Sequence, residues 1–400
     1  MPNIPSSGAI KFSDLKTDFG DTSPSSISEF YKGGGKVLST VDGDTINSSV
    51  PASGEVSLSD YFNAKGYFVH TISANVSDVD LPSVLSTAGW NGSQPVYLIV
   101  NANIYVYGLP RSSTMSPGIK IENNTSNPYY ITIKNNGYIF GAGGTDVGSG
   151  AAPTEAIKCS GSNAVYLTIK NTNFINGGGG AGKQITRQTS SSSSQYFGGG
   201  GGGAGGGHGD GLFYFNGSSS STQAQKANGI TNADGVEGQE GEGSDTNTTS
   251  GNYYALTGGG AGGGAGGGLY DGIRIGGAQG GGMGGFASLP TVFGNWSNYD
   301  DGPSGISLAA GGANNNAGES GISSGFNQNV YSSGQFGAGA GGGWGADGGN
   351  GMQYFWNGTV TSVHDTNARY DGASAIKNTS TGGSTTVESG LGGTMYGDVT

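Results

Sequence analysis

The side chains that could carry out catalysis are few and stand apart along the chain. The histidines are His70, His208 and His364, and the last two each have an aspartate within two residues. A histidine–aspartate pair could act as an acid–base couple or hold a metal ion. Catalysis, however, requires a rigidly supported imidazole, and the glycines around His208 do not supply that support. We therefore interpret His208 and His364 as loop residues.

Two further segments resemble ligand sites. The segment VEGQEGEGSD, residues 236–245, gathers four carboxylates, which are groups that Ca²⁺ prefers, but their spacing does not match an EF-hand loop. The segment GGGGAGK, residues 177–183, lacks the Ser or Thr that ends a phosphate-binding loop, because Gln184 follows the lysine. We predict no catalytic residue, no metal site and no cofactor, and hence a chain that is not an enzyme.

Aromatic side chains are better candidates for binding. Tyr and Trp provide large, rigid contact surfaces, and their flat faces stack on sugars and other bulky groups. In the C-terminal half of the chain they stand between glycine tracts, where they could instead cap the packed glycine segments and exclude water. The residues that we predict to contact a receptor are Tyr253, Tyr254, Trp296, Tyr299, Tyr331 and Trp356.

Composition narrows the possible partners. Glycine supplies 85 of the 400 residues, only 11% are charged, and the formal net charge is −12. An acidic chain repels phosphate backbones, so we expect no nucleic-acid partner. The single cysteine, Cys159, excludes an internal disulfide and is interpreted as a buried thiol. We see neither a signal-peptide pattern nor an apolar run of roughly 18 residues, and we expect release by cell lysis.

Residues 1–66 contain a repeated motif. The segment SGAIKFSDL (7–15) recurs as SGEVSLSDY (53–61), with ISEFYKGG (27–34) between them. A serine before an acidic and a bulky apolar residue is typical of a helix start, since its oxygen accepts a free backbone N–H and the acid favours the helix dipole. We expect short helical turns capped at Ser13, Ser28 and Ser59, in a module that attaches the chain to its neighbours. The residues of this attachment module that we predict to matter for attachment are Phe12, Leu15, Phe30, Tyr31, Tyr61 and Phe62.

Residues 67–182 are predicted to be β-structure. The segment YLIVNANIYVYG from Tyr97 aligns with YITIKNNGYIFG from Tyr130 and YLTIKNTNFING from Tyr166. Apolar and polar residues alternate within each copy, and an Asn-rich turn leads to a second short run. Each copy is therefore one strand–turn–strand rung. The rungs could stack as a solenoid or form a sandwich, and both alternatives are open.

Residues 183–400 form the predicted glycine-rich domain. Fixing a glycine backbone costs roughly 1–2 kcal/mol or more per residue, and no side chain is present to offset that cost. Backbone pairing must do so, and polyproline-type helices without Cβ atoms can pair on several sides. We predict a C-terminal domain of packed polyglycine-type helices, with a Gly/Ala β-sheet or disorder as alternatives. The predicted fold class is thus mainly β and irregular, with short helical turns at the N terminus.

These segments resemble bacteriophage proteins. The opening SGAIKFSDL…ISEFYKGG…SGEVSLSDYF looks like an N-terminal module of many phage virion proteins, and the rung YITIKNNGYIFGAGG resembles rungs of phage tail proteins and adhesins. The alternation of glycine tracts with variable loops is similar to the adhesins at the tips of T-even-type long tail fibres. In that family the glycine-rich domain consists of packed polyglycine helices, and its loops contact bacterial surface receptors.

The resemblance implies a virion protein of the tail. We expect a tail fibre or adhesin that presents a glycine-rich domain to a bacterial surface receptor, either a glycan or an outer-membrane protein. Its other partners would be phage tail and baseplate proteins, and a homotrimer follows by analogy with fibres. An architectural neck, collar or baseplate protein is the alternative, and a polysaccharide-degrading tailspike is the enzymatic one.

Overall fold

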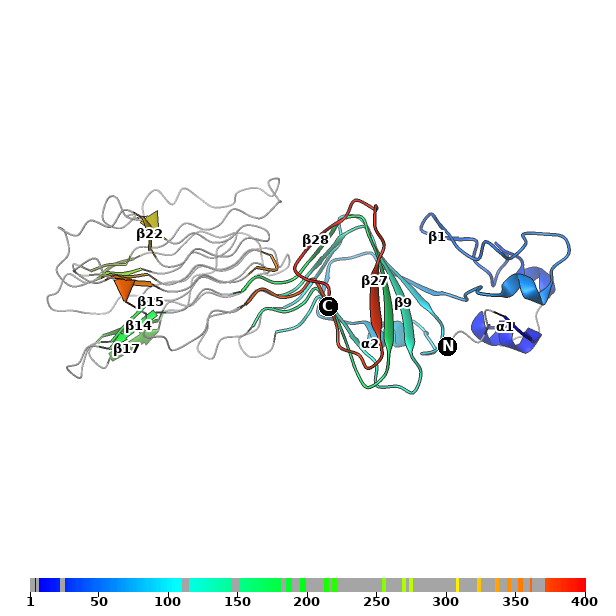
Figure 1. The fold of residues 1–400 in the computed structure, drawn as a ribbon, viewed down its shortest axis with the longest axis horizontal. Helices are drawn as coiled ribbons and strands as arrows, with labels where there is room; N and C mark the ends of the chain where they lie inside the picture. The colour runs from blue at the N-terminus through cyan, green and yellow to red at the C-terminus, as the bar shows by residue number, and fades with distance from the viewer. Residues whose placement is uncertain are drawn as a thin grey trace.

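Parallel β-sheets form the body of this computed structural model (Figure 1). The residues that the structure describes are 4, 7–21, 26–109, 115–144, 152–180, 344–346 and 371–400, together with the backbone of short strands between residues 185 and 361. None of the described helices is both long enough and apolar enough to cross a membrane.

Three sheets wrap around one core. The first sheet contains β3 (Phe68–Ile72), β6 (Val96–Val100), β9 (Tyr129–Asn135), β12 (Val165–Asn171) and β27 (Ser384–Val387). The second contains β4 (Val76–Ser77), β7 (Tyr105–Tyr107), β10 (Tyr138–Phe140), β13 (Phe174–Asn176) and β28 (Thr394–Tyr396). The third contains β5 (Val79–Asp80), β8 (Ile119–Glu122), β11 (Ile157–Ser160) and β26 (Ile376–Asn378).

The strands form a three-sided β-solenoid. Neighbouring strands are parallel, and their order in each sheet follows their order in the chain. The chain therefore visits the three sheets in turn, and each circuit adds one rung. The last rung consists of β27, β28 and a bridge from Val399 to Ile376.

Alternating side chains fill the solenoid. In β9 and β12 every second residue is buried, as Ile133 and Ile169 are, while the residues between them reach the surface. The inward residues of all three sheets belong to one hydrophobic cluster. Helix α2 (Leu81–Thr87) adds Leu81 and Leu85 to this cluster, so it closes the solenoid between β5 and β6. An alternating pattern of this kind is what a sheet with one buried face requires.

The predicted alignment of the first two copies is correct for only half of the rung. Tyr138 pairs with Tyr105, as aligned, but Tyr97 pairs with Thr132 rather than with Tyr130. The turn after β6 is two residues longer than the turn after β9, and it contains Asn103 in a left-handed conformation (φ 61°). The extra residues shift the register of β6 while leaving that of β7 unchanged.

The predicted fold class is wrong. The repeats are not a sandwich and are not irregular, because they build parallel sheets. A C-terminal domain of packed polyglycine-type helices does not appear among the described residues, where every element between 183 and 400 is a strand. Gly268–Tyr270, for example, pairs with Ile273–Ile275 in an antiparallel ladder. Strand pairing can therefore satisfy the backbone N–H and C=O groups of a glycine, as packed polyglycine helices would. Most of tracts 198–207 and 258–268 lies outside the described residues.

The described strands of this region are short. They are β14 (Ile185–Gln188), β15 (Gln195–Gly198), β16 (Leu212–Phe215), β17 (Ser218–Ser221), β18 (Tyr254–Leu256), β19 (Gly268–Tyr270), β20 (Ile273–Ile275), β21 (Ser307–Leu308), β22 (Ile322–Ser324), β23 (Gln335–Gly337), β24 (Met352–Tyr354) and β25 (Val360–Thr361).

The chain returns to the solenoid after residue 371. Residues 371–400 supply β26, β27 and β28, although the sequence pattern assigns them to the glycine-rich domain. The glycine-rich segment is therefore an insertion between β13 and β26 rather than a C-terminal domain. We call residues 181–370 the insertion.

The N-terminal module contains α1 (Phe12–Asp18), the 3₁₀ turns η1 (Ile27–Phe30) and η2 (Leu58–Tyr61), and the hairpin β1 (Thr40–Val41) and β2 (Asp44–Thr45). Figure 1 shows it, in blue, at one end of the molecule.

The three helical turns begin two residues earlier than predicted. Ser26 and Ser57 accept the backbone N–H groups of Ser28 and Ser59, so the predicted caps Ser28 and Ser59 lie inside their turns. In α1 the residue before the helix is Lys11, whose N–H donates to the Asp14 carboxylate at 2.8 Å.

Candidate functional site

Of the predicted receptor contacts, the structure describes only the backbone of Tyr254. Tyr254 is the first residue of β18, which pairs with β23, and its side chain is not described. The side chains of Tyr253, Trp296, Tyr299, Tyr331 and Trp356 are likewise not described. What the structure describes in detail are two junctions, which hold the N-terminal module and the insertion on the solenoid.

The predicted attachment residues come together as the core of the N-terminal module. Leu15, Phe30 and Tyr61 are fully buried, and Phe12 and Phe62 pack against them. Tyr61 donates its hydroxyl hydrogen bond to the Phe30 carbonyl at 2.9 Å. Tyr31 is half-buried and donates to the carbonyl of Gly54. These side chains therefore hold the module together.

The first junction is formed by the hairpin β1–β2 on the first sheet, and we call it the docking junction. Asp42 and Gly43 turn the hairpin with positive φ angles of 46° and 81°, which a two-residue hairpin turn with the right twist requires. Val41 is buried in a small cluster with Tyr97 and Ile99, on the outer face of β6. The hairpin thus covers apolar residues that the solenoid alone would expose.

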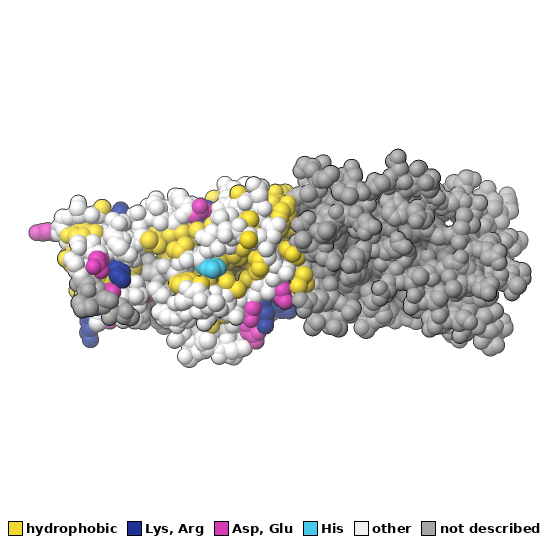
Figure 2. All heavy atoms as spheres, turned by 180° about the vertical axis from the view of Figure 1, so that it is seen from behind, with side chains coloured by type: hydrophobic (Ala, Val, Ile, Leu, Met, Phe, Trp, Pro, Cys, Tyr) yellow, Lys and Arg dark blue, Asp and Glu magenta, His cyan; other side chains and the backbone are white. Residues whose placement is uncertain are grey.

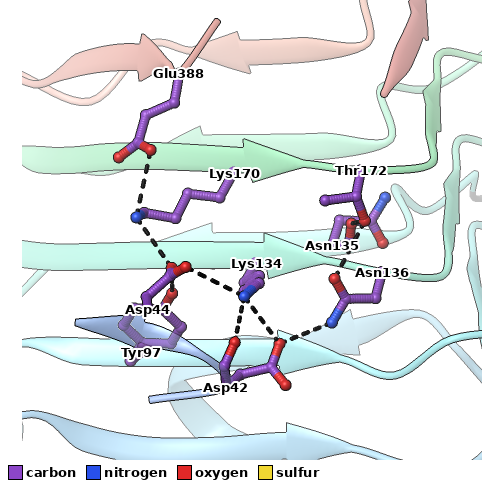
Figure 3. Close-up of polar contacts among 9 residues, drawn as sticks. All are labelled: Asp42, Asp44, Tyr97, Lys134, Asn135, Asn136, Lys170, Thr172 and Glu388. Atoms are coloured by element: carbon purple, nitrogen blue, oxygen red, sulfur yellow. Dashed lines mark hydrogen bonds and ion pairs between the residues drawn. The ribbon is translucent and has the colours of Figure 1, made fainter. Parts of the chain in front are cut away.

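Charged side chains of the hairpin and of the first sheet form a network at this junction (Figure 3). Lys134 of β9 lies 3.2 Å from the Asp42 carboxylate and 3.3 Å from that of Asp44. Lys170 of β12, one rung further along, lies 3.0 Å from Asp44 and 3.3 Å from Glu388. Two in-register lysines would repel each other, and the carboxylates of the hairpin offset that repulsion.

Asp44 lies at the centre of the network. The hydroxyl of Tyr97 donates to the same Asp44 carboxylate. Burial alone would raise the pKa of Asp44, but hydrogen bonds from Tyr97, Lys170 and Lys134 outweigh it and hold the pKa below its ordinary value. Burial and then the hydrogen bond to Asp44 raise the pKa of Tyr97 well above its ordinary range. The junction is therefore built for an ionised Asp44.

We expect Asp44→Asn to weaken the docking junction at neutral pH but not in acid. The folded pKa of Asp44 is lowered, so its contribution is present above the unfolded pKa and is lost as the pH falls through the folded pKa. The substitution should cost about 1–2 kcal/mol near neutral pH, since it removes charge-assisted hydrogen bonds. Thermal unfolding of both proteins, followed from neutral pH to below the ordinary value of 3.8, measures the difference. Glu55→Gln, at an exposed position of the same module, is the control. If the difference in unfolding temperature between Asp44→Asn and the unchanged protein stays constant into acid, the role of Asp44 is contradicted.

The second junction lies where the solenoid connectors leave the second sheet. The connectors from β7 to β8, from β10 to β11 and from β13 to β26 all run between the second and the third sheet. The third of them carries the insertion. We call the segments 141–144, 177–180, 344–346, 372–373 and 396–397, which meet at this corner, the insertion junction.

Backbone groups hold the insertion junction together. Gly177 donates to the Tyr396 carbonyl at 2.9 Å, and Gly178 donates to that of Thr154 at 3.0 Å. On other sides the carbonyl of Gly178 accepts from Ala373 at 2.9 Å, and that of Gly179 accepts from Gly144 at 2.8 Å. One four-residue segment thus bonds to several neighbours. Such close approach is possible because these residues have no Cβ.

The described residues offer little chemistry. They contain no group of three or more His, Cys, Asp or Glu side chains that could hold a metal ion. Cys159 is buried, as expected, and burial raises the pKa of its thiol to about 12. The Lys and Arg side chains in Figure 2 are few and mostly lie beside Asp or Glu. His208, His364 and the acidic segment 236–245 lie outside the described residues.

Comparison with known proteins indicates the role of the chain. Residues 67–261 match the family model of the phage tail fibre adhesin Gp38. The chain is a phage tail fibre adhesin. The match covers just under half of the chain, from β3 through β13 and into the insertion. It selects the adhesin over the architectural neck, collar or baseplate protein, and it places the chain in the virion tail.

Other comparisons add little. The adhesin is similar to a crystal structure of the gp37-gp38 adhesin tip complex of the bacteriophage S16 long tail fiber, with 14% identity over 87% of this chain and 88% of that chain. The TM-score is 0.34, which is too low for residues to be compared. No curated protein sequence matches the adhesin.

The docking residues of the adhesin are absent from the sequence-based predictions. Asp42 and Asp44 are separated from Lys134 by about ninety residues, as the ion pairs show. One signal was present, because Lys134 and Lys170 occupy the same place in two repeat copies, YITIKN and YLTIKN. Equivalent lysines on adjacent rungs lie side by side, and a carboxylate between them offsets their repulsion.

Among the residues that the structure describes, the buried side-chain amide of Asn176 lacks a hydrogen-bond partner. Asn176 is fully buried at the end of β13, between Phe140 and Tyr396 of the adjacent rungs, and neither polar atom of its side chain has a hydrogen bond. We expect Asn176→Leu to stabilise the adhesin by about 1 kcal/mol, since it removes an unsatisfied buried group. The midpoint of thermal unfolding should rise, while Asn127→Leu, at an exposed position, should leave it unchanged. A fall would contradict this expectation.

Proposed function

We propose that the adhesin binds a bacterial surface receptor through the insertion and joins the tail fibre through its N-terminal module. The observation that carries this proposal is the family match, which starts at the solenoid and continues into the insertion. The solenoid supports the proposal physically. Its sheets hold both ends of the insertion at one corner, and loops on a rigid scaffold commonly carry the residues that bind a partner.

The aromatic residues of the insertion are the proposed contacts. A glycan or an outer-membrane protein would pack against their flat rings. Purified full-length adhesin should block phage adsorption to host cells. A variant with alanine at Tyr253, Tyr254, Trp296, Tyr299, Tyr331 and Trp356 should lose that ability.

A matched control separates receptor contact from a general loss of aromatic surface. Tyr166→Ala removes a tyrosine that is 37% exposed on the solenoid, outside the insertion. This variant should block adsorption as well as the unchanged adhesin does. If the multiple-alanine variant also blocks adsorption fully, the aromatic contacts are refuted.

Three finer expectations remain proposals. The module residues Phe12, Leu15, Phe30, Tyr31, Tyr61 and Phe62 would keep the attachment surface folded. A homotrimer is expected by analogy with fibres, and light scattering measures it. The adhesin would act without catalysis, so its incubation with host polysaccharide should release no reducing sugars.

A further inference from the structure

Trp344 lies in the insertion but is buried against the solenoid. Its side chain is 1% exposed and stacks on Phe140 of β10, with ring centroids 4.6 Å apart and an interplanar angle of 25°. Tyr107 of β7 completes the cluster, and other aromatic residues of the second sheet pack around it. The residue belongs to the segment GGGWGADGG, which composition alone would assign to a flexible linker.

The two residues after Trp344 bond to the segment that leaves the solenoid. Gly345 donates to the carbonyl of Gly177 at 2.9 Å, and the carbonyl of Ala346 accepts from Gly180 at 2.9 Å. Residues 344–346 therefore pair with residues 177–180 at the start of the insertion. The pairing connects parts of the chain that are more than 160 residues apart in sequence.

Gly345 fits between two further backbones. It has a positive φ of 63°, and a Cβ at this position would lie 2.3 Å from the Gly397 nitrogen. On the return side, a Cβ on Gly372 would lie 2.3 Å from the Ala346 nitrogen. The segment 344–346 thus fills the space between the outgoing segment 177–180, the returning segment 372–373 and the last rung, and at Gly345 and Gly372 a Cβ would clash with backbone atoms.

We infer that Trp344-Gly345-Ala346 is a plug that closes the base of the insertion and that Trp344 is a positioning residue for receptor binding. In the part of the chain that the structure describes, the plug adds a contact with the solenoid to those at the two ends of the insertion. With it, a third contact restricts the directions in which the insertion can point, because each added contact removes conformations from a long loop. The effect on receptor binding rests on the proposed function, whereas the plug itself does not.

Hydrogen exchange on the full-length adhesin tests the plug directly. The amides of Gly180 and Gly345 donate across the junction, so they report whether it is closed. In Trp344→Ala these amides should exchange at least about tenfold faster, which corresponds to about 1.4 kcal/mol of opening free energy. Peptides from β9 and β12, inside the solenoid, should keep their protection. Tyr166→Ala, which removes a tyrosine that is 37% exposed on β12, should leave the exchange of Gly180 and Gly345 unchanged.

Two conservative variants keep the test decisive if Trp344→Ala does not fold. Trp344→Phe retains a ring to stack on Phe140, and Trp344→Leu fills space without a ring. The leucine variant should exchange faster at Gly180 and Gly345 than the phenylalanine variant. Equal exchange in these two, or unchanged exchange in Trp344→Ala, would overturn the plug.

Adsorption of phage to host cells separates the plug from the proposed function. Blocking of adsorption by Trp344→Ala should require at least about tenfold more protein, matching the expected opening. Faster exchange without any change in blocking supports the plug but overturns the positioning role of Trp344, and the multiple-alanine variant then tests the proposed function separately.

Discussion

Gly178→Ala is expected to destabilise the adhesin by at least about 3 kcal/mol, the range of severe overpacking. An alanine Cβ at this position would lie 1.9 Å from the carbonyl oxygen of Ala142 and 2.5 Å from its carbon. Both are backbone atoms, and residues 142 and 178 belong to connectors of adjacent rungs. Neither can move without breaking the hydrogen bonds that Gly178 makes with Thr154 and Ala373. Thermal unfolding and the yield of soluble protein measure the loss.

Gly35→Ala is the matched control for this prediction. Gly35 has no atom within 4 Å of an added Cβ and no positive φ, so alanine should be tolerated there. If both variants unfold at the temperature of the unchanged adhesin, the close packing of the insertion junction does not exist as described.

Asn171→Leu should cost at least about 3 kcal/mol, because it leaves several buried polar groups without partners at once. The Asn171 amide donates to the carbonyls of Asn173 and Thr394 at 3.0 and 3.1 Å. Its oxygen accepts from the side chain of Asn135 at 2.9 Å and from the backbone of Asn173 at 3.2 Å. Asn135 stands one rung earlier, so these side chains form a ladder that links three rungs at the turn between the first two sheets.

The reporter for Asn171→Leu is the last rung. Because Thr394 opens β28, amides of residues 394–396 should exchange faster in the variant. Asn127→Leu, at an exposed position, should change stability by less than about 0.5 kcal/mol. Equal stability of Asn171→Leu and the unchanged adhesin would refute the ladder.

Local features of the solenoid could be predicted from the sequence. Alternation and the repeated segments from Tyr130 and Tyr166 place β9 and β12 correctly, and those two residues pair in the structure. The three helical turns of the module were also recognisable, although their starts lay two residues earlier. Residue period and capping chemistry depend on near neighbours in sequence, and for that reason they can be found without a structure.

The sequence by itself determined that the repeated segments from Tyr130 and Tyr166 are strands and which composition marks the insertion. Only the tertiary structure decided that residues 371–400 complete the solenoid, that Asp44 meets Lys170, and that Trp344 lies on Phe140. Each of these contacts joins residues more than 100 positions apart. The sequence pattern around either residue does not reveal such contacts, because they depend on which rungs become neighbours when the chain folds. Glycine segments show the same limit most clearly. Without side chains they carry no pattern that selects one backbone partner over another, so packing with the rest of the fold makes that choice.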